Sequence, residues 1–164
     1  MIYTELTRKA INIAYKAHEG QLDRSGIPYI FHPYHVAEQM KDELTCCAAL
    51  LHDVIEDTDL TADDLRENGI PDSVIEIVLL LTHEDGTDYF DYVRKLAPNP
   101  YARAVKLADL AHNSDLSRIS GTYESPEKTS ERMKKYAAAK QILSEYGSIP
   151  YPNRKGRYMF LLSM

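Results

Sequence analysis

The residues best suited to chemistry follow an apolar run in the first third of the chain. Residues 46–51 carry no charge, and His52, Asp53, Glu56 and Asp57 come directly after them. The run has no Gly or Pro, which favours a buried helix over a strand. Buried imidazole and carboxylate groups must be paired or bind a cation. On a helix, His52 and Asp53 point about 100° apart, so they could flank a groove and bind one divalent ion. The alternative is that the acidic side chains are solvated at a helix end and that His52 is a core histidine whose hydrogen bonds are all made within the protein.

His32 could supply a third ligand. It precedes Pro33, a residue suited to the first turn of a helix, so the imidazole is expected at a helix entrance. Taken alone, His32 would be a structural residue beside a helix cap. With His52 and Asp53 it is a candidate ligand, because imidazole and carboxylate groups together form common divalent-metal sites.

Asp109 could supply the fourth ligand. It lies in a stretch of small and apolar residues, with Lys106 one helical turn before it and Asn113 one turn after it. A salt bridge to Lys106 would explain a buried carboxylate simply. Together with the histidine cluster, the pattern favours Asp109 as a ligand, with Lys106 and Asn113 near a substrate.

Helical periodicity and capping residues predict the elements that position these groups. The expected helices cover residues 4–18, 33–40, 44–55, 61–69, 71–81, 89–96, 101–117 and 126–146. Residues 19–29 contain Gly20, Gly26 and Pro28 and are expected to form a loop. The fold class is therefore all-α, with one domain over residues 1–147. The tail, residues 148–164, is expected to pack on the body or on a partner subunit.

Composition excludes several classes of protein. The chain has 164 residues, is 44% hydrophobic and carries a net charge of −6, so a nucleic-acid partner is not expected. No apolar run reaches membrane-spanning length, and no signal-peptide pattern follows Met1. Cys46 and Cys47 are adjacent within the apolar run and are typical of core thiols, which predicts a cytoplasmic protein. The sequence allows an oligomer without specifying one.

Three segments carry a family resemblance. HEGQLDRSGIPYIFHP (18–33), AALLHDVIEDT (48–58) and VKLADLAHN (105–113) resemble the hydrolase domain of RelA/SpoT proteins and their small stand-alone relatives, within the HD superfamily of metal-dependent phosphohydrolases. The resemblance implies an all-helical HD-type bundle that binds one Mn²⁺ and removes the 3′-pyrophosphate of ppGpp, the stringent-response nucleotide. It places the catalytic acids at Glu56 and Asp57. It places the metal ligands at His32, His52, Asp53 and Asp109.

The expected substrate contacts lie in the loop and in the helix that carries Asp109. Arg24 and Lys106 are the basic groups assigned to phosphates, and Ser25, Tyr29 and Asn113 are polar groups assigned to the nucleotide. The chain departs from the family at Asp23, where relatives have an arginine that stacks on guanine. It departs again at residues 114–116, where relatives have Met-Arg-Thr.

The chemistry follows from the residue types as well. A divalent ion can neutralise phosphoryl oxygens and lower the pKa of water, and a carboxylate beside it can accept the proton. Two imidazoles and two carboxylates leave open positions on a six-coordinate ion, which suits Mn²⁺. Two alternatives remain: a phosphohydrolase for another nucleotide, and a nucleotide sensor without turnover.

Overall fold

The computed structural model describes residues 1–119, 125–147, 151–152 and 158–159. Its helices confirm the predicted all-α fold class. They are α1 (Glu5–Ala17), α2 (Phe31–Glu38), α3 (Glu43–Leu51), α4 (Val54–Asp57), α5 (Ala62–Glu67), α6 (Asp72–Leu81), α7 (Tyr89–Leu96), α8 (Pro100–Asn113), the 3₁₀ helix η1 (Leu116–Ile119) and α9 (Pro126–Gly147).

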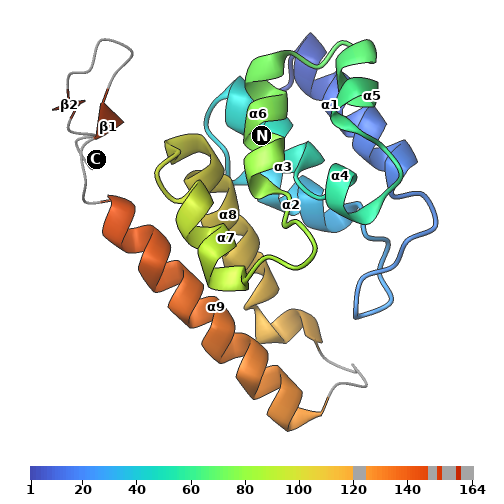
Figure 1. The fold of residues 1–164 in the computed structure, drawn as a ribbon. Coiled ribbons are helices and arrows are strands. Elements are labelled where there is room, and N and C mark those ends of the chain that lie inside the picture. Colours follow the sequence, from blue (N-terminus) through green and yellow to red (C-terminus); the bar gives the residue numbers. More distant parts are fainter. Residues whose placement is uncertain (120–124, 148–150, 153–157, 160–164) are drawn as a thin grey trace.

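Helix α3 is the centre of the bundle (Figure 1). It packs against α1, α2, α6 and α8, and every side chain from Thr45 to Leu51 is buried. Both cysteines are free thiols within this buried run, as predicted. A helix that is apolar all round must be covered on all sides, and these four helices provide that cover.

Two predicted helices end a full turn before their expected last residues. Residues 44–55 do not form one helix, because the chain breaks at His52 and Asp53 between α3 and α4. The helix predicted over 101–117 ends at Asn113. The Ser114 hydroxyl donates to the carbonyl of Leu110, and the Asp115 carboxylate accepts from the amide of Ser117. These local bonds end one helix and start η1, as side chains of this type commonly do at helix termini.

Helix α9 runs along one side of the bundle and packs on α7 and α8 (Figure 1). Ala139 and Leu143 are its buried side chains. After α9, β1 (Tyr151–Pro152) pairs antiparallel with β2 (Tyr158–Met159). The predicted docking of the tail, Ser148 to Met164, otherwise falls outside the described residues, so it stays a prediction.

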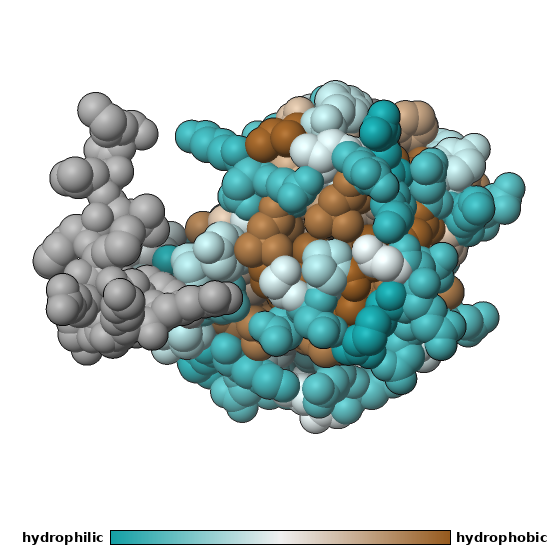
Figure 2. Space-filling model, turned by 90° about the horizontal axis from the view of Figure 1, so that it is seen from above, coloured by the Kyte–Doolittle hydropathy of each residue, from teal (hydrophilic) through white to brown (hydrophobic). Residues whose placement is uncertain are grey.

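The surface mixes polar and apolar groups. Figure 2, viewed from above the molecule of Figure 1, shows apolar side chains gathered near the middle of one face with hydrophilic side chains around them. More than half of the accessible surface of a folded protein is typically apolar, so exposed apolar area on one face needs no special explanation. Among the described residues, no helix is both long enough and apolar enough to span a bilayer.

Candidate metal centre and substrate pocket

The break between α3 and α4 places His52 and Asp53 side by side at the end of the central helix. Nδ1 of His52 lies 2.8 Å from the carbonyl oxygen of Ala49. A continuous helix would offer that carbonyl to the amide of Asp53. The imidazole therefore replaces a backbone bond of the helix, and the chain turns so that Nε2 of His52 lies 2.9 Å from Oδ2 of Asp53.

His32 and Asp109 meet this pair from α2 and α8. Nε2 of His32 lies 3.2 Å from Oδ1 of Asp109, and Nε2 of His52 lies 4.0 Å from the same oxygen. One ligand atom from each of these three buried residues falls within 4.8 Å of the other two. Segments far apart in the sequence thus bring two imidazoles and one carboxylate to one point; the fourth predicted ligand, Asp53, is not part of this group of three.

The donor set fits a cation. A carbonyl oxygen only accepts hydrogen bonds, so Nδ1 of His52 carries the proton and Nε2 of the neutral ring has a lone pair. Nε2 is buried and makes no hydrogen bond of ordinary geometry within the described residues, although Oδ2 of Asp53 lies 2.9 Å away. Burial alone would lower the pKa of His52, but the charges of Asp53 and Asp109 raise it to about 9. The site therefore favours positive charge at Nε2, which a divalent ion would supply.

The two oxygens of Asp109 have different partners. Oδ2 lies 2.8 Å from Nζ of Lys106, whereas Oδ1 faces the histidines and accepts from Nδ2 of Asn113. Burial alone would lower the pKa of Lys106, but the charge of Asp109 raises it well above its ordinary value. Lys106 therefore stays charged. Both predicted substrate residues on α8 contact the carboxylate of Asp109.

Asp53 is held by Tyr29. The Tyr29 hydroxyl donates to Oδ2 of Asp53, and this oxygen also lies 3.7 Å from Nε2 of His32. Burial and the charge of Asp53 raise the pKa of Tyr29, so the phenol remains a donor. Tyr29, predicted from the sequence as a substrate residue, thus orients a candidate ligand directly.

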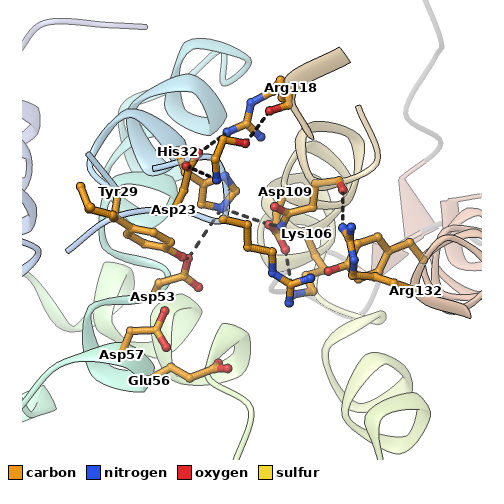
Figure 3. A pocket seen from close by; sticks show the side chains of 15 residues that line it. Asp23, Tyr29, His32, Asp53, Glu56, Asp57, Lys106, Asp109, Arg118 and Arg132 are labelled. Atoms are coloured by element: carbon orange, nitrogen blue, oxygen red, sulfur yellow. Dashed lines mark hydrogen bonds and ion pairs between the residues drawn. The ribbon is translucent and has the colours of Figure 1, made fainter. Parts of the chain in front are cut away.

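Glu56 and Asp57 point into the same cavity from α4 (Figure 3). Oε2 of Glu56 accepts the amide of His83 at 2.8 Å. Burial raises the pKa of Glu56, although this hydrogen bond acts in the opposite direction. Burial and the charge of Asp53 raise the pKa of Asp57 as well. These carboxyls therefore bind a proton more readily than exposed ones, which suits proton transfer.

The cavity beside the cluster has a volume of about 380 Å³ and contains all but one of the residues predicted from the sequence. His52 lies behind its wall. Arg24 and Ser25 come from the loop over residues 19–29, and Lys106 and Asn113 come from α8. Cationic side chains thus surround a group of carboxylates, an arrangement suited to a phosphorylated ligand that approaches a metal.

Sequence reasoning missed several residues of the cavity. Arg118 of η1 lies 3.1 Å from Oδ2 of Asp23 and forms an ion pair with it. Arg132 and Tyr136 of α9 line the opposite wall, and Nη1 of Arg132 donates to the carbonyl of Asn113 (Figure 3 shows Arg118 and Arg132). Spacing of i and i+4 places Arg132 and Tyr136 on one face of α9, but no local signal shows which face meets the site.

Comparisons with known proteins identify relatives of this chain. A GTP pyrophosphokinase of Streptomyces coelicolor is 34% identical over 142 residues, which cover 79% of this chain and 17% of that protein. The bifunctional (p)ppGpp synthase/hydrolase SpoT of Escherichia coli K12 is 40% identical over 121 residues, which cover 65% of this chain and 17% of that protein. The chain therefore corresponds to a small part of these relatives.

A solved structure has the same fold. It is described as a metazoan ortholog of SpoT that hydrolyzes ppGpp, and it matches with a TM-score of 0.67 at 23% identity. The match covers 89% of this chain and 96% of that one, and at this identity it bears on the fold alone. Residues 10–139 match the HD domain family. The chain therefore belongs to the HD domain family.

Proposed function

We propose that this protein is a metal-dependent phosphohydrolase that converts ppGpp to GDP and pyrophosphate. The observation that carries the proposal is the convergence of ligand atoms from His32, His52 and Asp109 beside a cavity lined by both carboxylates and cations. The (p)ppGpp hydrolase activity named for the E. coli SpoT relative supports the choice of substrate.

Four residues would hold the metal: His32, His52, Asp53 and Asp109. Three already bring ligand atoms together, and Asp53 lies beside both histidines. A bound Mn²⁺ would neutralise phosphoryl oxygens and lower the pKa of water. Lys106 and Tyr29 hold the two carboxylates in place from outside the cluster, as partners of metal ligands commonly do.

Glu56 and Asp57 are proposed to handle the proton. Each must be ionised to accept a proton from the attacking water. The water oxygen forms a bond to phosphorus as the bond to the 3′-oxygen breaks, so a protonated carboxyl can give its proton to the 3′-oxygen of the departing GDP. Their raised pKa values bring uptake and release of the proton closer to neutral pH.

The nucleotide is proposed to bind along the cationic walls. Arg24 and Ser25 would contact it from the loop, and Lys106 and Asn113 from α8, where their contacts with Asp109 place them beside the metal ligands. Arg118 and Arg132 add positive charge to the same cavity. Guanidinium groups suit this role because they bind phosphate through paired hydrogen bonds.

One observation favours a second candidate substrate class. The position expected to carry a guanine-stacking arginine holds Asp23, whose carboxylate is paired with Arg118 in the cavity wall. A different base, or none, could be accommodated there. The second candidate is therefore a phosphohydrolase of the same mechanism acting on another nucleotide.

A substrate panel tests the proposal. Purified protein with Mn²⁺ would be incubated with ppGpp, GTP, dGTP and a nucleoside monophosphate, and the products separated by ion exchange. GDP and pyrophosphate from ppGpp, abolished by EDTA and restored by Mn²⁺, are the expected result. Preferred turnover of another nucleotide would select the second candidate. Tight ppGpp binding without turnover of any nucleotide would show a sensor instead.

A further inference from the structure

The nitrogen of His32 that faces away from the ligand cluster has a histidine partner. Nδ1 of His32 lies 2.7 Å from Nδ1 of His112, and the two ring planes are 21° apart, so the rings meet edge to edge as an N–H···N hydrogen bond requires. Both residues are buried. Two nitrogens this close are joined by one proton, which one of them donates to the other. The identity of the donor therefore decides which nitrogen of His32 carries the proton.

Arg118 identifies the donor. Its Nη1 lies 2.9 Å from Nδ1 of His112, and a guanidinium can only donate. Nδ1 of His112 is therefore an acceptor, and its single lone pair is shared by the N–H groups of Arg118 and His32. It follows that His32 carries its proton on Nδ1. The lone pair of its neutral ring is then on Nε2, which faces Oδ1 of Asp109 at 3.2 Å.

Arg118 is held from three sides. Its guanidinium donates to the carbonyl of His112 at 3.1 Å and to Oδ2 of Asp23 at 3.1 Å. Its own carbonyl accepts the hydroxyl of Ser25 at 2.5 Å. Oδ1 of Asp23 in turn accepts the amides of Ser25 and Ile27, so the loop that carries Asp23 is braced locally. The guanidinium is thereby oriented by groups on two separate segments.

We propose that His112 and Arg118 are positioning residues that hold His32 in the tautomer able to bind a metal through Nε2. The inference rests on the proposed metal centre and deepens it. Partners of this kind, one step away from a ligand, commonly change metal affinity by about 10- to 100-fold. The contacts also link the loop at Asp23 to a metal ligand through two side chains.

The first test removes the acceptor. Mn²⁺ affinity would be measured by titration calorimetry on wild type, His112→Phe and His112→Asn, with thermal melts to confirm folding. Phe keeps an aromatic ring at this position but has no acceptor atom in place of Nδ1, so the affinity for Mn²⁺ should fall by about 10- to 100-fold. Asn can place an oxygen near the position of Nδ1 and should recover most of the loss. His35→Phe is the matched control, because His35 is exposed and its ring stacks on that of His112, with 4.2 Å between the ring centroids.

The second test uses Arg118, so that the inference does not depend on a buried substitution. Coulomb's law alone predicts that removal of a positive charge strengthens binding of a cation. If Arg118 instead acts by holding His112 and His32 in place, its removal weakens binding of the cation. Arg118→Met should therefore lower the affinity for Mn²⁺. Combined with His112→Phe it should add little, because both changes remove the same constraint.

The possible outcomes separate the inference from the function. Unchanged Mn²⁺ affinity in His112→Phe, or tighter binding in Arg118→Met, would overturn the positioning role while leaving the metal centre intact. Absence of Mn²⁺ binding in wild type would overturn the centre itself. Histidine NMR of the Zn²⁺-loaded protein gives an independent readout. Coordination of His32 through Nε2, with a proton on Nδ1, is expected, and coordination through Nδ1 would contradict the inference.

Discussion

Nζ of Lys106 lies 2.8 Å from Oδ2 of Asp109, so the lysine occupies one oxygen of a carboxylate whose other oxygen faces the histidines. From the sequence alone, a salt bridge to Lys106 and metal binding are alternative roles for Asp109. In the structure they are compatible, because they use different oxygens. Lys106 also offsets part of the negative charge that the cluster buries, and its Nζ lies over the Tyr92 ring, 5.4 Å from the centroid.

Replacing Asp109 should therefore affect metal binding and stability separately. Asp109→Asn keeps the size of the side chain but removes its charge, so Mn²⁺ content by elemental analysis should fall sharply. It also leaves Lys106 without its charged partner, which should lower the free energy of unfolding by up to about 3–5 kcal/mol. Adding Lys106→Met should recover much of that stability without restoring the metal. Wild-type metal content in Asp109→Asn would show that Asp109 is not a ligand.

Local sequence signals were sufficient to predict the structure of segments whose conformation depends on their own residues. Helix α7 spans the predicted residues 89–96, because Asp88 caps it and its apolar side chains recur at helical spacing. His32, His52 and Asp109 could be predicted because buried ionisable groups in apolar segments require partners. The break at His52 could not, because it depends on an imidazole that takes a particular backbone carbonyl.

Contacts between distant segments were beyond local reasoning. Arg118 and Asp23 are 95 residues apart, and Arg118 lies in a polar stretch with no helical or motif signal of its own. His112 was visible as a polar residue in an apolar helix, but its contact with His32 depends on how α2 and α8 pack. Arg132 and Tyr136 reach the cavity through the packing of α9 against α8, which no periodicity in α9 specifies.

Glu56→Gln should separate proton transfer from metal binding. The amide oxygen of Gln can still accept the His83 amide, so the local structure should persist. Mn²⁺ affinity should stay near wild type, while the rate falls by about two to four orders of magnitude, the usual effect of removing a proton-transfer group. Glu84→Gln, an exposed carboxyl paired with Lys95, is the matched control. Loss of metal from Glu56→Gln would instead make Glu56 a ligand.

The raised pKa of Glu56 predicts the pH dependence of the rate. The carboxylate form accepts the proton, so activity should fall as pH drops through a pKa displaced upward by burial. The acidic limb of kcat at saturating Mn²⁺ should therefore lie above the range of an exposed glutamate. Unfolding returns this carboxyl to its ordinary pKa, so the folded state binds more protons there. Its contribution to stability should therefore grow as pH falls through that window.

In Glu56→Gln, the residual rate should no longer fall over this acidic pH range. Metal occupancy must be followed in parallel, because protonation of the histidines also releases the metal at low pH. A limb that persists unchanged in Glu56→Gln would assign the titration to another group, with Asp57 the first to test because burial raises its pKa also.

Tyr29→Phe decides whether Tyr29 serves the metal site or the substrate. The substitution removes the hydroxyl that donates to Oδ2 of Asp53 and leaves the ring beside His32, 5.6 Å between centroids. Without this donor Asp53 is less well oriented, and Mn²⁺ affinity should fall by about tenfold or somewhat more. Tyr34→Phe is the control, because its hydroxyl bonds only the exposed hydroxyl of Tyr3 among the described contacts. If Tyr29→Phe leaves Mn²⁺ affinity unchanged but raises KM for the nucleotide, then Tyr29 contacts the substrate, as the sequence predicted.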